Sequence, residues 1–446
     1  MTQGALLPKI LLFSIPLMIS SMLQLLFNAA DIVVVGQFSG DKVAGAHYVA
    51  AIGSTGSCIN LLLSVLMGLS VGVNVLVARY FAGRQEREVQ ETVRTTIAVA
   101  ILGGILVGAV GALLSKPILT LMGSPAEVIE LSALYMRIYF AGLPVTMLYN
   151  FGSAVLRATG DTRRPLYFLC AAGVLNVLLN LFFVIGLHLH VVGVALATVL
   201  SQFVSAGLVL RSLVRTQEIY RLELRKMRIY RDKFLRILNV GLPAGLQGAV
   251  FSLSNVLIQS SINEFGSIAM AGSAAGANLE GFVYMAMNSV YQASVSFTSQ
   301  NFGARRMDRI GRVLRTCLAV VAVIGLVLGN TFYLLGPRLV GIYTSDAEAI
   351  AFGVERMSII CTTYLLCGMM DVACGSLRGM GYSTVPMIVS IAGACGLRVV
   401  WILTIFRYYH SLRMLYISYP VSWAVTGVVH LICYLVIVAR IRKEQS

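Results

Sequence analysis

The chain has 446 residues, of which 58% are hydrophobic and 12% are charged, and its mean hydropathy is +0.83. A soluble globular protein needs more polar residues than this to cover its surface, whereas helices of about 20 apolar residues would cross a bilayer repeatedly. The net charge of +15 does not indicate nucleic-acid binding, because the basic residues lie in short loops between apolar segments. The composition therefore predicts an all-α polytopic membrane protein.

Apolar segments of membrane-spanning length follow one another along the chain. We expect twelve transmembrane helices, at about residues 10–35, 46–78, 93–115, 131–156, 166–187, 191–213, 237–262, 268–299, 314–335, 353–377, 386–407 and 415–439. The first of these segments is too long for the core of a signal peptide, so we expect it to remain as a span.

The basic residues between the segments predict the orientation of the chain. Of the 34 Lys and Arg residues, 26 lie on the side shared by both termini and five on the opposite side. Cytoplasmic loops of membrane proteins carry the excess of Lys and Arg. We therefore expect both termini in the cytoplasm.

The chain also contains an internal duplication. LRATGDTRRP (156–165) returns as LRGMGYSTVP (377–386), and ARYFAGRQ (78–85) is echoed at the same offset by SQNFGARR (299–306). Each half has an even number of expected spans, so the two copies enter the membrane in the same sense and form a parallel repeat. We expect two six-helix lobes, at 1–213 and 237–446, joined by a solvated, basic, cytoplasmic connector at 214–236.

Three of the 19 acidic residues lie inside otherwise apolar, membrane-length stretches: Asp31, Glu280 and Asp371. An ionisable residue inside a membrane is costly and usually belongs to an ion or substrate pathway. Asp31 would lie about 32 Å along a straight first helix that starts at residue 10. A carboxylate that is merely hydrated near the outer interface is therefore the alternative for Asp31. Taken together, the three acids indicate a transporter that uses carboxylate charge.

Three motifs of the first half resemble the multidrug and toxic compound extrusion (MATE) transporters. Pro16 precedes Asp31 by fifteen residues, the second span carries the Gly-rich GLSVGVNVLVARYFAG (68–83), and LRATGDTRRP follows the fourth span. With the duplication, the chain is similar to bacterial members over almost its whole length. The resemblance implies an inner-membrane antiporter that exports amphipathic or cationic drugs, toxins or metabolites in exchange for H⁺ or Na⁺ by alternating access.

The resemblance also implies a cation-coupling cluster in the first lobe. Asp31 matches the acidic residue of the family's first helix, Asn176 and Asn180 match the polar pair of its fifth, and Thr198 matches the hydroxyl of its sixth. The two asparagines are four residues apart and share one helix face. Several members have Asp where Asn180 stands, and Asn takes up no proton although its carbonyl can bind a cation. Proton coupling would then depend on Asp31, and Na⁺ could bind the same cluster.

In the second half, Asp371 resembles the family's acidic residue of the tenth helix, and Glu280 an acidic position of some bacterial members. Both could bind a cationic substrate. Alternatively, Arg398 could neutralise either acid, which would make that acid structural. The acidic residue that certain sodium-coupled members have in the seventh helix has no counterpart here, which weakens a sodium site of that type.

Aromatic side chains and one proline complete the expected site residues. Cation–π and apolar contacts to a substrate could come from Tyr139, Tyr149, Tyr284, Tyr291 and Met285, although such residues more often pack. Pro16 lacks an internal helix hydrogen bond and would serve as a hinge or form a static kink.

Two other functions are compatible with the sequence. A lipid-linked precursor flippase of the same wider superfamily would need several basic residues in its cavity, whereas the intramembrane charge is mostly acidic. An integral membrane enzyme is disfavoured because the five histidines are scattered and the eight cysteines show no metal-binding spacing. There is no P-loop motif, so an ion gradient should supply the energy. We expect neither enzyme activity nor a cofactor. The expected partners are a small organic substrate and membrane lipids, but no nucleic acid. We also expect the protein to be a monomer.

Overall fold

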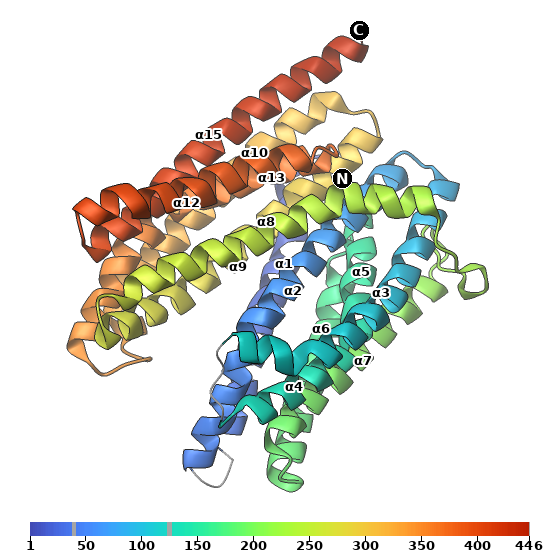
Figure 1. Cartoon of the computed structure of the whole chain (residues 1–446). Helices are drawn as coiled ribbons and strands as arrows, with labels where there is room; N and C mark the ends of the chain where they lie inside the picture. Colours follow the sequence, from blue (N-terminus) through green and yellow to red (C-terminus); the bar gives the residue numbers. More distant parts are fainter. Residues whose placement is uncertain (38–41, 123–126, 446) are drawn as a thin grey trace. The chain divides into compact units, whose positions relative to one another are not determined.

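The computed structural model describes residues 1–37, 42–122 and 127–445, and the regular structure in these residues is helical throughout. The first half (Figure 1) contains α1 (Leu6–Gln37), α2 (Lys42–Ala82), α3 (Glu86–Leu121), α4 (Ile129–Ala141), α5 (Leu143–Thr159), α6 (Arg163–Leu181), the π-helical η1 (Phe182–Gly186) and α7 (His190–Arg215).

The second half begins with a short 3₁₀ turn in the connector. Its elements are η2 (Leu224–Lys226), α8 (Arg231–Asn263), α9 (Ser267–Gly303), α10 (Met307–Leu334), α11 (Gly336–Val340), α12 (Ala347–Gly379), α13 (Thr384–Ser390), the π-helical η3 (Ile391–Gly396), α14 (Leu397–Trp401), the π-helical η4 (Ile402–Phe406) and α15 (Leu412–Gln445).

Most of these helices are long enough to span a membrane. Among the described residues, ten helices pass by length and hydropathy, and the pair α4 and α5, bent by 47°, forms an eleventh span. α9 has 37 residues, which is long enough to span a membrane, but its hydropathy is lower than that of these spans. Its Gly, Ser and Ala residues make it less apolar than its neighbours, but they also allow other helices to approach closely.

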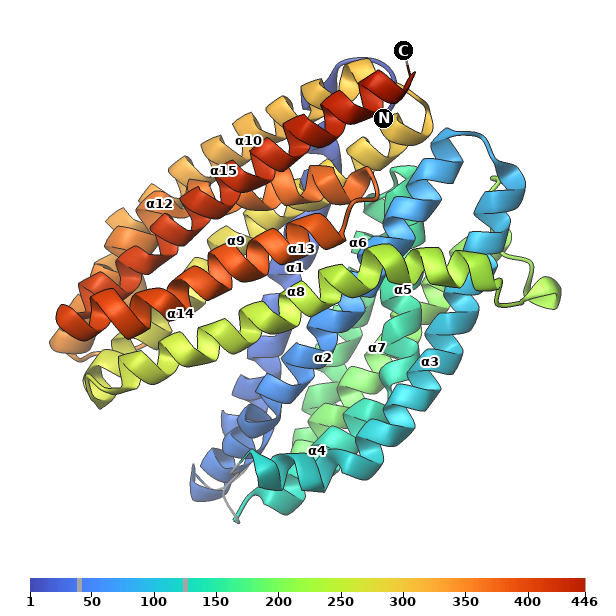
Figure 2. The ribbon, with the colours of Figure 1, turned by 45° about the horizontal axis from the view of Figure 1, so that its top comes forward.

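One compact unit consists of Ile19–Leu238. Within it α5 packs against both α3 and α7 (Figure 2). The close approach of α3 and α5 depends on glycine, because a Cβ atom at Gly104 would lie 2.4 Å from the Cα atom of Pro144. Small residues replace bulky ones at such contacts in membranes, where packing rather than hydrophobic burial holds helices together.

The other compact unit consists of Met1–Met18 together with Asn239–Ser446. In both views α9, α10 and α15 pack along α12 (Figures 1 and 2). The first residues of α1 belong to this core: the ring of Phe13 meets that of Phe297 edge-on at 5.6 Å, and Arg309 donates a hydrogen bond to the Gly4 carbonyl at 3.0 Å. α1 and α8 therefore each contribute residues to both units. The lobe limits expected from the repeat, 1–213 and 237–446, stay a prediction.

The internal repeat is visible in the positions where helices begin. Arg163 begins α6 and Thr384 begins α13, and these two starts are separated by the offset of the sequence repeat. His190 begins α7 and Leu412 begins α15, and the separation of these two starts differs from the same offset by a single position. Equivalent positions of these two helix pairs can therefore be compared to within one residue.

Part of the connector is packed rather than solvated. Tyr220 and Leu222 are buried, and the Leu222 amide donates to the Leu213 carbonyl at 2.9 Å. The Tyr220 ring lies 6.1 Å from that of Phe81 on α2. The expectation of a fully solvated linker is wrong for these residues, because two apolar side chains in the basic segment anchor it to the helices of its own unit.

Candidate functional site

Asp31, Asn176, Asn180 and Thr198 form one hydrogen-bonded cluster in the unit Ile19–Leu238. Asn180 donates from Nδ2 to Asp31 Oδ1 at 2.5 Å and lies 3.2 Å from Asn176 Oδ1. Thr198 Oγ1 lies 3.4 Å from Asp31 Oδ2 and 3.5 Å from Asn176 Nδ2. α1, α6 and α7 thus bring together polar residues from three segments that are far apart in sequence.

The charge of Asp31 is buried without a basic partner. The side chain is 9% exposed, and in the described part of the chain its hydrogen-bond partners are the neutral Asn180 and Thr198. A buried carboxylate with no opposite charge is strongly unfavourable in a membrane. A proton or a bound cation at this position would remove that cost.

The oxygen atoms around Asp31 suit a hard cation. Asn180 is 0% exposed, and its Oδ1 atom has no hydrogen-bond partner among the described residues. Rotation of this amide would exchange Nδ2 for Oδ1 beside the carboxylate. Together with Thr198 Oγ1 and Asn176 Oδ1, the cluster then offers only oxygen ligands. Na⁺, like other hard cations, prefers oxygen ligands. No group of three or more His, Cys, Asp or Glu that could hold a metal occurs in the described residues.

The backbone next to the cluster is irregular, because η1 begins two residues after Asn180. π-helical turns inside α-helices are frequent at functional sites. An apolar cluster that includes Val34, Val184 and Val194 packs here, and Tyr139 packs against it from α4. Tyr135, one helical turn before Tyr139, is buried in the same cluster and was not expected from the sequence.

Glu280 is held by an arginine that the sequence did not single out. Arg356 of α12 donates to Oε1 from Nε at 2.9 Å and to Oε2 from Nη2 at 2.8 Å, and its Nη1 bonds Ser273 Oγ at 3.1 Å. Both charged residues are buried. Arg356, and not Arg398, therefore neutralises Glu280. This pairing favours the structural alternative for that acid.

Asp371 is in a different situation. It is half-buried on α12, and in the described residues it forms neither a hydrogen bond nor an ion pair. Arg378, two helical turns later, is turned to other partners: it donates to the Tyr291 hydroxyl at 2.6 Å and to Gln247 Oε1 at 2.7 Å. Arg378 therefore does not form an ion pair with Asp371.

The remaining sequence-predicted residues lie in less polar surroundings. Tyr284 is partly buried against the large core of its unit, and Tyr149 is buried, with its hydroxyl donating to the Pro165 carbonyl at 3.3 Å. Tyr149 therefore packs. Pro16 lies inside α1, which continues on both sides of it.

The buried charge of the second unit is not mostly acidic. Arg356, Arg378 and Arg398 are buried in this unit, which also contains the two acids Glu280 and Asp371. The argument that disfavoured a flippase on charge alone is therefore weaker than the sequence suggested.

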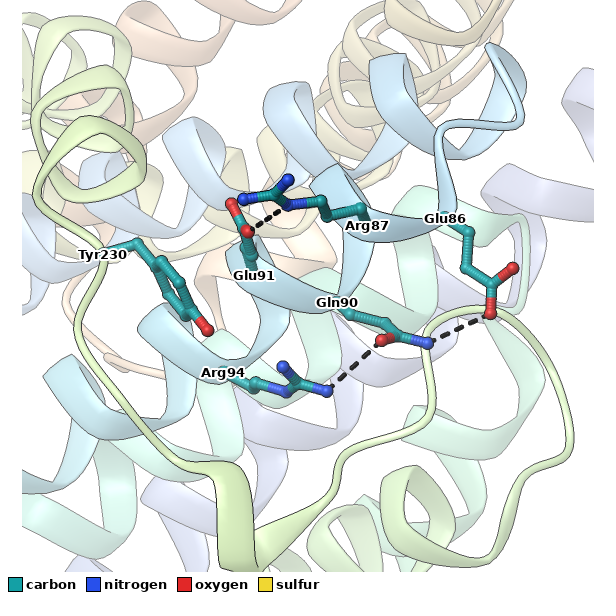
Figure 3. A pocket seen from close by; sticks show the side chains of 6 residues that line it. All are labelled: Glu86, Arg87, Gln90, Glu91, Arg94 and Tyr230. Carbon is teal, nitrogen blue, oxygen red and sulfur yellow. Dashed lines mark hydrogen bonds and ion pairs between the residues drawn. The ribbon is translucent and has the colours of Figure 1, made fainter.

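A second polar region lies at the start of α3 (Figure 3). A pocket of about 560 Å³ is lined by Glu86, Arg87, Gln90, Glu91, Arg94 and Tyr230. Arg87 pairs with Glu91 at 2.8 Å, and Arg94 bonds both Gln90 and Glu223 at 3.2 Å. Most of its charges are thus balanced within the protein, and the pocket joins α3 to the connector.

The comparison with protein families identifies the chain. A model of the MatE family matches residues 16–182 and 243–404, which is most of the chain. The chain belongs to the MatE family. This MatE protein is therefore a multi-pass membrane transporter and not an enzyme.

Relatives and solved structures agree with this assignment. Two proteins of Bacillus subtilis are similar. Probable multidrug resistance protein YoeA is 28% identical over 93% of this chain and 90% of its own length. Probable multidrug resistance protein YpnP is 30% identical over 85% of this chain and 84% of its own length. A transporter of the MOP superfamily from Pyrococcus furiosus has 22% identity, a TM-score of 0.91, and coverage of 99% of this chain and 98% of its own. The outward-facing structure of a multidrug resistance MATE transporter gives the same values. The predicted twelve-helix, two-lobe fold is confirmed.

Proposed function

We propose that this MatE protein is a secondary antiporter that exports amphipathic or cationic organic compounds in exchange for H⁺ or Na⁺. The observation that carries the proposal is the buried Asp31 carboxylate, whose partners Asn180 and Thr198 are neutral. Such a group can alternate between an empty, negatively charged state and a state that is neutralised by a bound proton or cation. Two relatives named as multidrug resistance proteins support the substrate class.

The roles within the cluster follow from its chemistry. Asp31 carries the charge that changes during transport, because it is the cluster's only titratable group. Asn176, Asn180 and Thr198 orient the carboxylate and supply neutral oxygens to a bound cation. A family transporter needs no cofactor for this cycle.

In the second unit we propose that Asp371 recognises the positive charge of a substrate. Its carboxylate has no hydrogen-bond or ion-pair partner among the described residues, whereas Glu280 is neutralised by Arg356. Tyr139 and Tyr284 are proposed to contribute contacts to the apolar part of the substrate, and Pro16 to allow α1 to bend during alternating access.

We further propose that the protein is a monomer of the plasma or inner membrane with both termini in the cytoplasm. The uneven distribution of Lys and Arg supports this orientation. Reporter fusions at each terminus test it, and an external signal at either end contradicts it.

Gradient-driven transport tests the coupling. Protein reconstituted in liposomes is given a pH or Na⁺ gradient, and transport of a fluorescent organic cation is followed. We expect Asp31→Asn to lose gradient-driven transport while it still binds the dye and elutes as one species. The matched control is Asp308→Asn, which changes an exposed acid at the start of α10. Wild-type coupling in Asp31→Asn would assign the role to Asp371 instead, since Glu280 is paired with Arg356.

A lipid-linked precursor flippase remains the second candidate, because Arg356, Arg378 and Arg398 are buried in the second unit. It predicts translocation of a lipid pyrophosphate in the same liposomes without an ion gradient. Antiport predicts none.

A further inference from the structure

Arg398 is a buried cation that lacks an acidic partner. It lies on α14 and is 2% exposed, and its Nε donates to Ser422 Oγ at 3.0 Å. No carboxylate of the described residues lies within ion-pair distance, and its Nη1 and Nη2 atoms form no hydrogen bond there. A guanidinium inside a membrane normally pairs with an anion, so a missing partner is the feature to explain.

Aromatic rings enclose the guanidinium instead. Its central carbon lies 4.3 Å from the ring centroid of Tyr419 and 5.7 Å from that of Trp423. Trp423 in turn stacks on Tyr364 at 5.3 Å, with the two rings inclined by 12°. Ring faces stabilise a cation partially, but they leave its outward hydrogen-bond donors unused.

The internal repeat puts this group where the first unit has its candidate coupling cluster. By the offset of the sequence repeat Tyr419 corresponds to Thr198, whereas by the starts of α7 and α15 it corresponds to the neighbouring Ala197. Arg398 itself aligns with Val177, next to Asn176. However, η3 precedes Arg398, whereas the equivalent part of α6 is a regular α-helix. A π-helical turn contains about one extra residue, which rotates the following side chains by roughly one position. Arg398 consequently takes the orientation that corresponds to Asn176.

We propose that Arg398, Tyr419 and Trp423 form a binding site for the anionic group of an aromatic, amphipathic compound. The guanidinium donates from Nη1 and Nη2 to a carboxylate, sulfonate or phosphate, and the rings contact the adjacent aromatic part. The anion comes from a transported solute or from a phospholipid headgroup. With Asp371 on the same unit, the protein would accept zwitterionic compounds as well as simple cations.

This inference concerns the substrate class. That the bound compound is transported rests on the proposed export function, whereas its binding can be tested separately. The probes are an esterified, cationic rhodamine dye and the same dye with its carboxylate free. Binding to the purified full-length protein is measured without a gradient, so failure of the antiport proposal would not affect the result. The variants are Arg398→Gln, Arg398→Lys and, as a control, Arg407→Gln, which removes an exposed arginine nine residues away.

We expect Arg398→Gln to weaken binding of the free-carboxylate dye about tenfold and to leave the ester unchanged, since a charged hydrogen bond is lost. Arg398→Lys should retain part of the preference, and Arg407→Gln all of it. Equal effects on both dyes, or no effect on either, would overturn the solute form of the proposal.

A second arm distinguishes the lipid. The same binding is measured in nanodiscs of phosphatidylcholine alone and with added phosphatidylglycerol, and co-purified lipid is quantified for each variant. If a headgroup is the ligand, phosphatidylglycerol competes with the free-carboxylate dye in the wild type, and Arg398→Gln carries less bound anionic lipid. If neither the dye nor the lipid depends on Arg398 in protein that elutes and melts as the wild type does, the anion site is wrong.

Discussion

Arg356 holds Glu280 by both carboxylate oxygens, at 2.9 and 2.8 Å, and so ties α12 to α9 inside the second unit. The remaining Nη1 is used by Ser273, and the guanidinium lies 5.5 Å from the ring centroid of Tyr416. Each partner therefore offsets the cost of burying the other. Neither residue has charge to spare for a substrate.

The first prediction follows from this pair. Arg356→Met or Glu280→Leu alone should lower the free energy of unfolding by about 3–5 kcal/mol, because each leaves one buried charge unpaired. The double variant should lose less than either single variant. Thermal unfolding of the purified protein measures the changes. The control Glu264→Gln breaks an exposed pair with His410 and should change stability by less than about 1 kcal/mol. Single variants that are as stable as the control would contradict a structural pair.

The second prediction concerns Asn180. Asn180→Asp places a second carboxylate against Asp31, and two adjacent negative charges require a second proton or cation. The number of ions exchanged per substrate should rise toward two. The reversal potential of dye transport in liposomes measures this ratio, and Asn330→Asp, at a partly exposed position of α10, is the control. An unchanged ratio in a folded variant would place ion coupling outside this cluster.

A third prediction tests helix packing in the second unit with two glycines of α10. A Cβ atom at Gly329 would lie 2.1 Å from the Cys361 carbonyl oxygen, whereas at Gly311 the nearest atom is 3.9 Å away. Gly329→Ala should therefore destabilise the protein by about 1–3 kcal/mol through overpacking. Gly311→Ala should be neutral or slightly stabilising, because alanine favours helix. Equal melting temperatures for the two variants would show that α10 and α12 can separate without cost.

A fourth prediction concerns pH and the connector. The hydrogen bond from Lys226, together with the nearby Arg94, holds the pKa of Glu223 below its usual value. A lowered pKa means that this contribution to stability is present above the usual titration range of Glu and is lost as pH falls below it. Amide hydrogen exchange in 216–230, corrected for its intrinsic rate, should rise as pH falls below about 4. Glu223→Gln should exchange quickly already at neutral pH, and identical profiles for both proteins would contradict this role.

The sequence predicted the polar cluster better than it predicted the ion pairs. Asn176 and Asn180 are one helical turn apart, so their common face follows from helix geometry. Asp31 was identified as an acid inside an apolar stretch, and the resemblance supplied Thr198. Glu280 and Arg356 are separated by 76 residues. Nothing in such a separation indicates contact, because it depends on how α9 crosses α12.

The partners of Arg398 illustrate a second limit. The repeat offset could have pointed to Tyr419 as the counterpart of Thr198, but the rotation of Arg398 depends on η3. A π-helical turn has no clear signature in hydrophobic periodicity. The sequence therefore suggested Arg398 as a counter-ion for an acid, whereas its described neighbours are a serine and aromatic rings.

The start of α1 has a consequence for how the two copies of the repeat can exist. Ile10, Phe13 and Leu17 are buried in the core that the second half of the chain builds. A fragment that begins at residue 239 would expose the surface that these side chains cover, and a fragment that ends at 238 would carry them without a partner. The duplicated halves are thus not autonomous modules: severed from each other, they should regain a native core only when both fragments are present together.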